Sequence, residues 1–437
     1  MSIVVPKSFK YSPEMSFSNK SEKFETNYLQ PMNGSSFPLG TGKVQFEVEN
    51  HQDDRINDVE NCYMMCKINN ASTDTDFYLQ GRAGTASLVK NFRLETSSGQ
   101  KFSELTSSNV LYPILLSKSV DDEYLNKKGK YLMGTGAPSV ITTTMNTATP
   151  PAATTLVSYP GYGDVIPQGS FIEKIIPLAQ FTGMKKMPMK GREVTRFIVE
   201  LEESAVCGFN DPIANNLITL TDCQLVYNTY KLNPAFTNQL IPENAIITSE
   251  DWIGQTEVIP AASTKQNIKV GFSKKYLKKL IVCFRNGNDS VDSTKLSLCA
   301  RNKANIKEIL VRHNAQPIHS NAIRLSNTNN LQSYCELMNS HGGLYNLHTT
   351  SLSDLYNTQE SAGDDDTTCG QFFYEVDLEN GFEMDSVGFS GIDVGQNAVT
   401  IEITKDATTQ DQVVNIFGLY ANQYTYVNGV WIVSDPL

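Results

Sequence analysis

The side chains that most often do chemistry in proteins are few in this sequence, and their spacing suits no catalytic arrangement. Four of the five histidines fall in pairs separated by five or six residues, whereas side chains on one helical face recur every three or four residues. Neither an HExxH nor a CxxC motif is present. We therefore predict no catalytic residue and no metal site built on the histidines, which are His51, His313, His319, His341 and His348.

Two glycine-containing segments approach known motifs without completing them. A phosphate-binding loop requires a glycine five positions before its Gly-Lys pair and Ser or Thr after it. Around Gly42-Lys43 these positions hold Phe37 and Val44. The segment Gly388-Phe389-Ser390-Gly391 is one residue short of a nucleophile elbow, since Ile392 stands where the second glycine belongs. The sequence therefore predicts no cofactor.

Two clusters of charge have both a functional and a structural interpretation. Asp364, Asp365 and Asp366 could help to hold a hard cation such as Ca²⁺, but the neighbouring Gly363 and Thr367 favour a solvated loop. A basic cluster could contact nucleic acid, an acidic lipid surface or a negatively charged neighbour. We favour a solvated strand edge, where lysine also blocks unwanted strand pairing. This cluster consists of Lys265, Lys269, Lys274, Lys275, Lys278 and Lys279.

Composition indicates a folded chain with sizeable cores. Hydrophobic residues make up 40% of the 437 positions and charged residues 19%, a balance that excludes disorder over most of the length. The formal net charge of −11 argues against direct binding of nucleic acid through massed basic residues. No apolar run approaches the roughly 20 residues of a membrane helix, and the apolar start Ile3-Val4-Val5 is too short for a signal peptide.

The eight cysteines are expected to be reduced. Cys62 and Cys66 would lie roughly 13 Å apart on one strand, beyond the Cα separation of about 7 Å that a disulfide allows. We interpret the cysteines as small core residues, which points to synthesis inside a cell. The full set is Cys62, Cys66, Cys207, Cys223, Cys283, Cys299, Cys335 and Cys369.

Short segments of alternating apolar residues predict strands along most of the chain. Val44, Phe46 and Val48 alternate with polar neighbours, as in a half-buried strand. Turn residues separate these segments, which is typical of a sandwich or barrel. The predicted strands are 44–49, 63–68, 87–95, 171–178, 194–201, 218–232, 267–271, 279–285, 295–299, 306–312, 371–378, 399–404, 413–420 and 424–433. Helices are expected at 108–118 and 330–339.

Composition also divides the chain into an arm, two domains and one long loop. Residues 1–38 are polar, with four prolines and little periodicity, so we predict an N-terminal extended arm outside the core. Asn233-Pro234 and Pro242 place a boundary near residue 238, which gives domains 39–238 and 239–437. Within the first domain, residues 134–163 are rich in Thr and Pro, which predicts a long exposed loop.

The two predicted domains repeat one order of elements. In each, a strand, a polar turn and a helix follow one another, at 89–118 and again at 306–339. Phe197-Ile198-Val199-Glu200-Leu201 is echoed by Val399-Thr400-Ile401-Glu402-Ile403, and a tyrosine-rich strand follows each. The offset is about 200 residues throughout, so we predict an internal duplication.

Several segments resemble one family of viral proteins. They are Pro31-Met32-Asn33-Gly34, Phe37-Pro38-Leu39-Gly40 and Asn50-His51-Gln52-Asp53-Asp54 near the start, and 414–420 before 424–431 near the end. In their order and in chain length, they resemble the double jelly-roll major capsid proteins (hexon-like) of the adenovirus–tectivirus lineage. The closest likeness is to the capsid proteins of polintons (mavericks) and adintoviruses.

This resemblance implies an all-β fold of two consecutive eight-stranded jelly-roll sandwiches with short helices in the loops. It also implies a major capsid protein, and not an enzyme, whose pseudo-hexagonal homotrimers tile an icosahedral shell. The implied partners are further copies of the chain and penton and minor capsid proteins, and an internal membrane is compatible with it. The implied location is the virion, after synthesis in the host-cell interior.

Two other classes of function stay open at this point. A receptor- or glycan-binding sandwich of the spike type would need a concave aromatic platform, whereas the tyrosines of the final strands alternate as core residues do. A β-sandwich hydrolase would need a pair of carboxylates in a cleft. The sequence favours the capsid protein over both.

Overall fold

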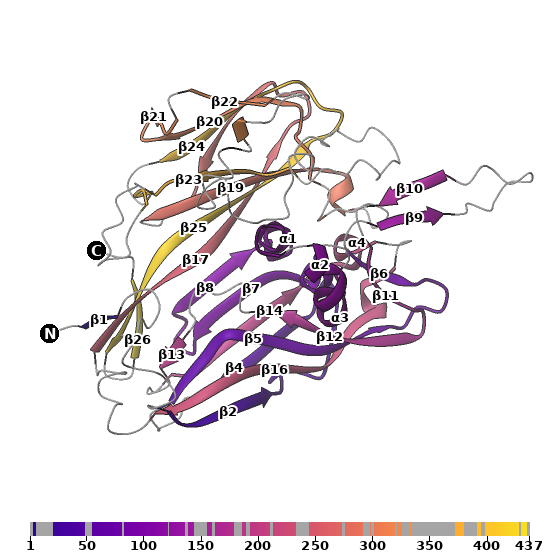
Figure 1. Ribbon diagram of the computed structural model, residues 1–437, viewed down its shortest axis with the longest axis vertical. Coiled ribbons are helices and arrows are strands. Elements are labelled where there is room, and N and C mark those ends of the chain that lie inside the picture. Colours follow the sequence, from indigo (N-terminus) through magenta and orange to yellow (C-terminus); the bar gives the residue numbers. More distant parts are fainter. Residues whose placement is uncertain are drawn as a thin grey trace, which may run out of the picture.

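Two β-sandwiches lie side by side in the computed structural model of this chain, with helix α1 between them (Figure 1). The structure describes residues 3–5, 21–48, 55–80, 83–120, 122–135, 139–143, 155–159, 162–178, 186–188, 193–209, 213–232, 244–272, 276–291, 298, 301–319, 321–325, 332–333, 335, 372–379, 391–394, 398–427 and 430–434. No helix in these ranges is long and apolar enough to cross a membrane.

The first sandwich packs two sheets with four main strands each. One sheet has the order β12-β5-β16-β2 and the other β4-β14-β7-β8. The strands of the first sheet are β12 (Ser170–Pro177), β5 (Arg55–Asn70), β16 (Ile218–Leu232) and β2 (Ser21–Leu29), with β3 (Ser36–Pro38) and β13 (Lys186–Pro188) added to it. Those of the second are β4 (Lys43–Val48), β14 (Thr195–Leu201), β7 (Val89–Thr96) and β8 (Lys101–Thr106).

The second sandwich repeats this plan. One sheet has the order β1-β17-β25-β19-β23 with β26 beside β25, and the other has the order β18-β24-β20-β21 with β22 beside β20. The first sheet contains β1 (Ile3–Val5), β17 (Asn244–Ile259), β25 (Gln412–Val427), β19 (Leu277–Asn286), β23 (Tyr374–Asp377) and β26 (Val430–Ser434). The other contains β18 (Lys265–Val270), β24 (Val399–Lys405), β20 (Ile306–His313), β21 (Gln316–Pro317) and β22 (Ile323–Arg324).

Strand order shows that both sandwiches are jelly rolls. Along the chain, the eight main strands are β2, β4, β5, β7, β8, β12, β14 and β16 in the first sandwich and β17, β18, β19, β20, β21, β23, β24 and β25 in the second. In both sandwiches, one sheet has the order sixth-third-eighth-first and the other has the order second-seventh-fourth-fifth. The echoed segments Phe197–Leu201 and Val399–Ile403 lie in the two seventh strands, β14 and β24. The predicted fold of two consecutive jelly-roll sandwiches is therefore confirmed.

Alternation of side chains builds the cores. On β4, Val44, Phe46 and Val48 are buried while their neighbours are half-buried or exposed. On β24, Val399 and Ile401 are buried in the same alternating way. Because successive side chains on a strand point to opposite faces, this pattern turns one face of each sheet inward.

The connections carry the helices. Between β8 and β12 lie α1 (Ser108–Ser119), α2 (Asp122–Tyr124), the π-helical turn η3 (Leu125–Gly129), α3 (Lys130–Met133), β9 (Ser139–Thr143), β10 (Thr155–Tyr159) and β11 (Tyr162–Ile166). Other connections hold β6 (Phe77–Gln80), η2 (Gly84–Leu88), α4 (Ser204–Cys207), β15 (Gly208–Phe209), η5 (Asn215–Leu217) and η6 (Asp289–Val291). The helix predicted at 108–118 is α1. Most of the one predicted at 330–339 lies outside the described residues.

Residues 134–163, predicted as a long loop, contain a hairpin. β9 and β10 pair antiparallel from Ser139↔Tyr159 to Thr143↔Thr155 and project from one end of the molecule (Figure 1). The prediction weighed the small polar residues and the prolines. It gave too little weight to the β-branched residues Val140, Ile141 and Val157, which favour strands.

Several strands lie where the sequence analysis expects none, among them the main strands β2, β8 and β17. β2 falls within the predicted arm 1–38, yet it pairs with β16 from Leu29↔Leu225 onward. It is an edge strand held by main-chain hydrogen bonds, so it needs little apolar pattern. β17 follows the predicted boundary, and its inward positions include polar Ser249 and Asp251, which hide the alternation. The domain limits themselves stay a prediction.

Candidate assembly surfaces

A seam of apolar contacts joins the two sandwiches. We define the seam as the contact of β8 and α1 with β17, β23, β25 and β26. Phe102 of β8 meets Tyr424 and Trp431 edge-on, with ring centroids 5.4 Å apart in both pairs. All three rings are buried in one hydrophobic cluster. The cores of the two sandwiches are therefore continuous across the seam.

The Tyr424 hydroxyl organises the polar part of the seam. It lies 2.5 Å from the Phe102 carbonyl oxygen and is hydrogen-bonded to the Asp251 carboxylate. Asn422 donates to the same hydroxyl over 3.0 Å. Burial, together with the charge of Asp251, raises the pKa of Tyr424 well above its ordinary value, so the hydroxyl keeps its proton. These buried polar groups specify one relative placement of β8 and β17.

A buried ion pair forms a second tie across the seam. Lys118 near the end of α1 lies 2.5 Å from Glu375 of β23, whose side chain is fully buried. Desolvation lowers the pKa of Lys118 even though Glu375 favours its charged form. Removing either partner would leave the other charge buried without its counter-ion. The pair therefore ties the connection between β8 and β12 of the first sandwich to the sheet of the second.

The long connections of both sandwiches meet at one end of the molecule. The side-chain amide of Gln80 donates to the carbonyl oxygens of Val206 and Gly208. Its own oxygen accepts a 2.9 Å hydrogen bond from the Leu298 N–H. Gln80 belongs to the connection between the third and fourth strands of the first sandwich, and Leu298 to the same connection of the second. The two sandwiches therefore stand in the same orientation.

The predicted lysine cluster does not form one patch. Lys265 and Lys269 are exposed on β18, an edge strand, which is the strand-edge setting that the sequence favours. Lys278 is instead buried between two glutamates at 2.8 and 2.9 Å, and Lys279 is half-buried. Two lysines lie outside the described residues, Lys274 and Lys275.

The segment that approaches a phosphate loop is a tight turn. Gly40 has a φ of +76°, and the Gly42 N–H donates to the Pro38 carbonyl oxygen at 2.7 Å. A Cβ on Gly42 would come within 2.3 Å of that oxygen. Lys43 pairs with Glu200 at 3.5 Å. The glycines therefore serve the chain reversal between β3 and β4.

The residues described here contain no group of three His, Cys, Asp or Glu that could hold a metal ion. The ring of His313 contacts the Asp393 carbonyl oxygen at 3.1 Å, and His319 is half-buried. The remaining candidates fall outside the described ranges: His51, His341, His348, Asp364, Asp365, Asp366 and Ser390.

Five cysteines are buried free thiols, as the interpretation of small core residues requires. Burial raises the pKa of each of them, and that of Cys223 reaches about 12. The five are Cys62, Cys66, Cys207, Cys223 and Cys283. Cys335 is half-buried and free, and Cys299 and Cys369 lie outside the described residues.

Large apolar side chains are exposed on both sandwiches, where a neighbouring molecule could cover them. On the first they include Tyr28, Met32, Tyr131 and Phe171. On the second they include Val258, Val291, Val430 and Ile432. None of these exposed residues stands out in the sequence. Of the seam residues, the sequence brings out Tyr424 as part of a tyrosine-rich strand, whereas Asp251 lies in β17, whose alternation is hidden by Ser249 and Asp251.

Comparison with solved structures assigns the fold. The Vp54 protein of PBCV-1, fitted into a reconstruction of the virophage Sputnik, matches with a TM-score of 0.61 and 12% identity over 98% of this chain and all of that one. The Faustovirus major capsid protein matches with a TM-score of 0.59 and 10% identity over 92% and 90% of the two chains. The chain has the double jelly-roll fold.

The same fold recurs in the Sputnik virophage structure, with a TM-score of 0.58 and 9% identity over all of this chain and 93% of that one. The predicted resemblance to the double jelly-roll lineage is therefore confirmed for the fold. No protein-family profile matches the sequence, and no curated protein sequence matches it.

Proposed function

We propose that this chain is the major capsid protein of a virus or virus-like element, with a structural and not a catalytic role. The observation that carries the proposal is the pair of jelly rolls of one topology, joined in one orientation by the Gln80 contacts and the buried seam. Solved chains of the same fold include the Faustovirus major capsid protein and the PBCV-1 capsid protein.

The geometry supports a homotrimer as the building unit. Two lobes of one shape in each chain become six lobes in a three-fold assembly, so the trimer presents a nearly hexagonal outline. A hexagonal tile covers a surface by repeating one set of edge contacts, which is how identical subunits close a shell. Exposed apolar residues on both lobes, such as Phe171 and Val258, supply surface for such contacts.

In the proposed shell, the partners are other copies of the chain, first within the trimer and then between trimers. Penton and minor capsid proteins would complete the vertices of the shell and the joints between trimers. The protein would reside in the virion after synthesis in the host cell. The formal net charge of −11 gives the chain as a whole no general attraction for nucleic acid.

The test is the mass and outline of the purified full chain. Light scattering is expected to give three times the chain mass of 48.4 kDa, and electron microscopy is expected to show six-lobed particles. A purified chain that stays monomeric at micromolar concentration and forms no tiles would contradict the proposal.

A further inference from the structure

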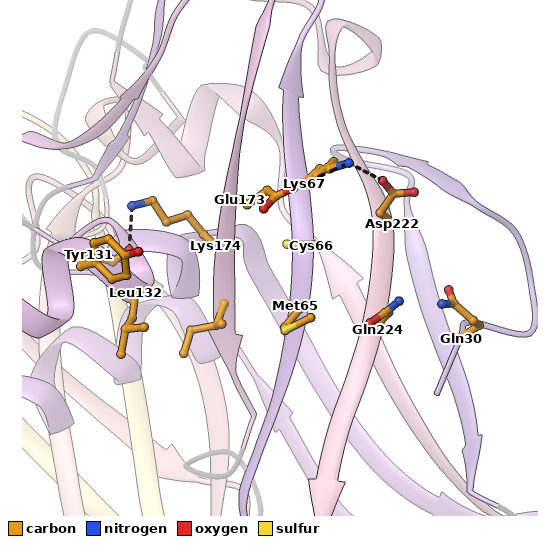
Figure 2. A pocket seen from close by; sticks show the side chains of 11 residues that line it. Gln30, Met65, Cys66, Lys67, Tyr131, Leu132, Glu173, Lys174, Asp222 and Gln224 are labelled. Carbon is orange, nitrogen blue, oxygen red and sulfur yellow. Dashed lines mark hydrogen bonds and ion pairs between the residues drawn. The ribbon is translucent and has the colours of Figure 1, made fainter. Parts of the chain in front are cut away.

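The outer face of the first sandwich contains a hollow of about 570 Å³, shown in Figure 2. Met65 and Ile175, cross-strand partners on β5 and β12, form its floor. Tyr131 and Leu132 of α3 form one wall, and Gln30 and Gln224 lie on the opposite side. The volume lies in the range of roughly 300–1,000 Å³ that small-molecule sites occupy.

The lysines that line the hollow are neutralised by carboxylates. The Lys67 ammonium lies 2.8 Å from the Asp222 carboxylate and 3.6 Å from the Glu173 carboxylate. Lys67 and Glu173 are cross-strand partners on β5 and β12, two positions along from Met65 and Ile175. Lys174 pairs with Asp164 at 2.6 Å. Two lysines and three carboxylates therefore meet at the hollow, so it carries no net positive charge. Such a surface has no net attraction for a phosphate or a sialic acid.

Helix α3, which forms one wall of the hollow, is held in place by Lys174 of β12. The Lys174 ammonium donates to the carbonyl oxygens of Lys130 and Tyr131, at 3.1 and 2.9 Å. This fixes α3 against β12, while the Tyr131 side chain stays 81% exposed. A rigidly based aromatic ring with an open face packs well against the C–H face of a sugar.

The opposite side offers unused hydrogen-bonding groups. Within the described residues, the side-chain amides of Gln30 and Gln224 make no hydrogen bond. Each amide provides two N–H donors and one carbonyl acceptor, and both lie at the hollow in Figure 2. Neighbouring hydroxyls, each both donor and acceptor, match amides of this kind.

We propose that this hollow binds a neutral sugar unit, with one face of the ring on Tyr131 and its hydroxyls on Gln30 and Gln224. An uncharged polar ligand with one apolar face suits the paired lysines, the open amides and the aromatic wall together. The proposal goes beyond assembly, because it gives the first sandwich a ligand.

The experiment uses the full chain and saturation-transfer NMR. The probes are methyl α-mannoside, methyl α-glucoside and N-acetylglucosamine, with N-acetylneuraminic acid and glucose 6-phosphate as charged counterparts. We expect signal transfer to at least one neutral sugar and none to the charged ones. Affinity is expected to fall roughly tenfold in Tyr131→Ala and in Gln224→Ala. The matched control is Tyr28→Ala, which removes an exposed tyrosine outside the hollow.

Three results would overturn the proposal. One is that no signal transfer is seen to any of the three neutral sugars. Another is binding that survives both Tyr131→Ala and Gln224→Ala. The third is a smaller native mass for Tyr131→Ala with no sugar bound by the unaltered chain, because the hollow would then be a contact between copies of the chain. Light scattering of the unaltered chain separates this last result from a failed trimer, because the unaltered chain keeps the trimer mass in the first case and loses it in the second.

Discussion

The two sandwiches share one strand order but differ in what surrounds it. In the first, the connection from β8 to β12 carries three α-helices and a hairpin, and it builds the wall of the hollow. Both main sheets also carry added strands, but these differ: β3 and β13 join β16 and β5 in the first sandwich, whereas β1 joins β17 and β26 joins β25 in the second. The comparison teaches that alternation in the strands fixes the shape of a lobe, while connections and edges give each lobe its own surface.

The comparison extends to single residues. Glu200 on β14 and Glu402 on β24 occupy equivalent positions in the two seventh strands. Glu200 accepts a hydrogen bond from Asn91 at 2.9 Å, whereas Glu402 pairs with Arg312 at 2.8 Å. The duplicated frame thus keeps a carboxylate at one place and changes the group that meets it.

The largest expected effect comes from removing one core aromatic ring from each sandwich. Phe197 packs near Phe92 in the first, and Phe284 packs near Phe372 in the second. Phe197→Ala and Phe284→Ala are each expected to lower the free energy of unfolding by about 3–5 kcal/mol. Urea unfolding followed by circular dichroism measures this. Because the cores are continuous, both variants should unfold in one transition, and a separate early step in either would contradict the continuity.

The next effect tests the ion pair of the seam. Lys118→Ala leaves the buried Glu375 carboxylate without its lysine, so we expect a loss of about 3 kcal/mol in stability. Lys127→Ala removes an exposed partner of Glu123 and should leave the thermal midpoint unchanged. The double variant Lys118→Met with Glu375→Leu should recover most of the loss. Equal midpoints for the two single variants would rule out a structural role for the pair.

A smaller effect is expected at the seam hydroxyl. Tyr424→Phe keeps the ring against Phe102 but removes the group that meets Asp251, which should cost about 1–3 kcal/mol. Tyr28→Phe, on an exposed ring, is the control. Unfolding midpoints in guanidinium provide the measurement. Identical midpoints for Tyr424→Phe and the unaltered chain would show that the hydroxyl adds nothing to the seam.

The smallest effect separates the equivalent glutamates. The Asn91 hydrogen bond, followed by the charge of Lys43, lowers the pKa of Glu200 below its ordinary 4.5. Its stabilising contribution is therefore complete above the unfolded-state pKa and is lost as the pH falls through the lower folded-state value. In Glu200→Gln, the free energy of unfolding should fall less steeply below about pH 4.5, and the difference from the unaltered chain should be less than about 1 kcal/mol. Thermal midpoints measured across this pH range show it. An unchanged acid limb would contradict this, and Glu402→Gln gives the matched comparison.

The strands that can be predicted from the sequence are those with an apolar inward face. β16 has the predicted bounds 218–232, because hydrophobic residues fill its inward positions. β17 is as long, yet Ser249 and Asp251 occupy inward positions and conceal it. A buried carboxylate makes sense only with its partner Tyr424, which is 173 positions away. Tertiary pairing of this kind leaves no local pattern.

The hollow is a second feature beyond the reach of sequence. Tyr131 lies in a short helix of a long connection, and nothing in its neighbours indicates that its ring stays exposed. The tyrosines that the sequence does bring out, such as Tyr424 and Tyr426, are buried, as their alternation predicts. Which aromatic residue faces solvent is decided by how α3 is held against β12.

In each sandwich the first and last main strands are neighbours. Thr26 of β2 and Asn228 of β16 are hydrogen-bonded across 202 positions of sequence, and β17 pairs with β25 from Asn244↔Val427 onward. On the ribosome, neither lobe can close its main sheet until its eighth strand has emerged. Until then the strand that will pair with the eighth strand has an unpaired edge. Nascent chains on neighbouring ribosomes of one mRNA are therefore exposed to domain swapping through these edges.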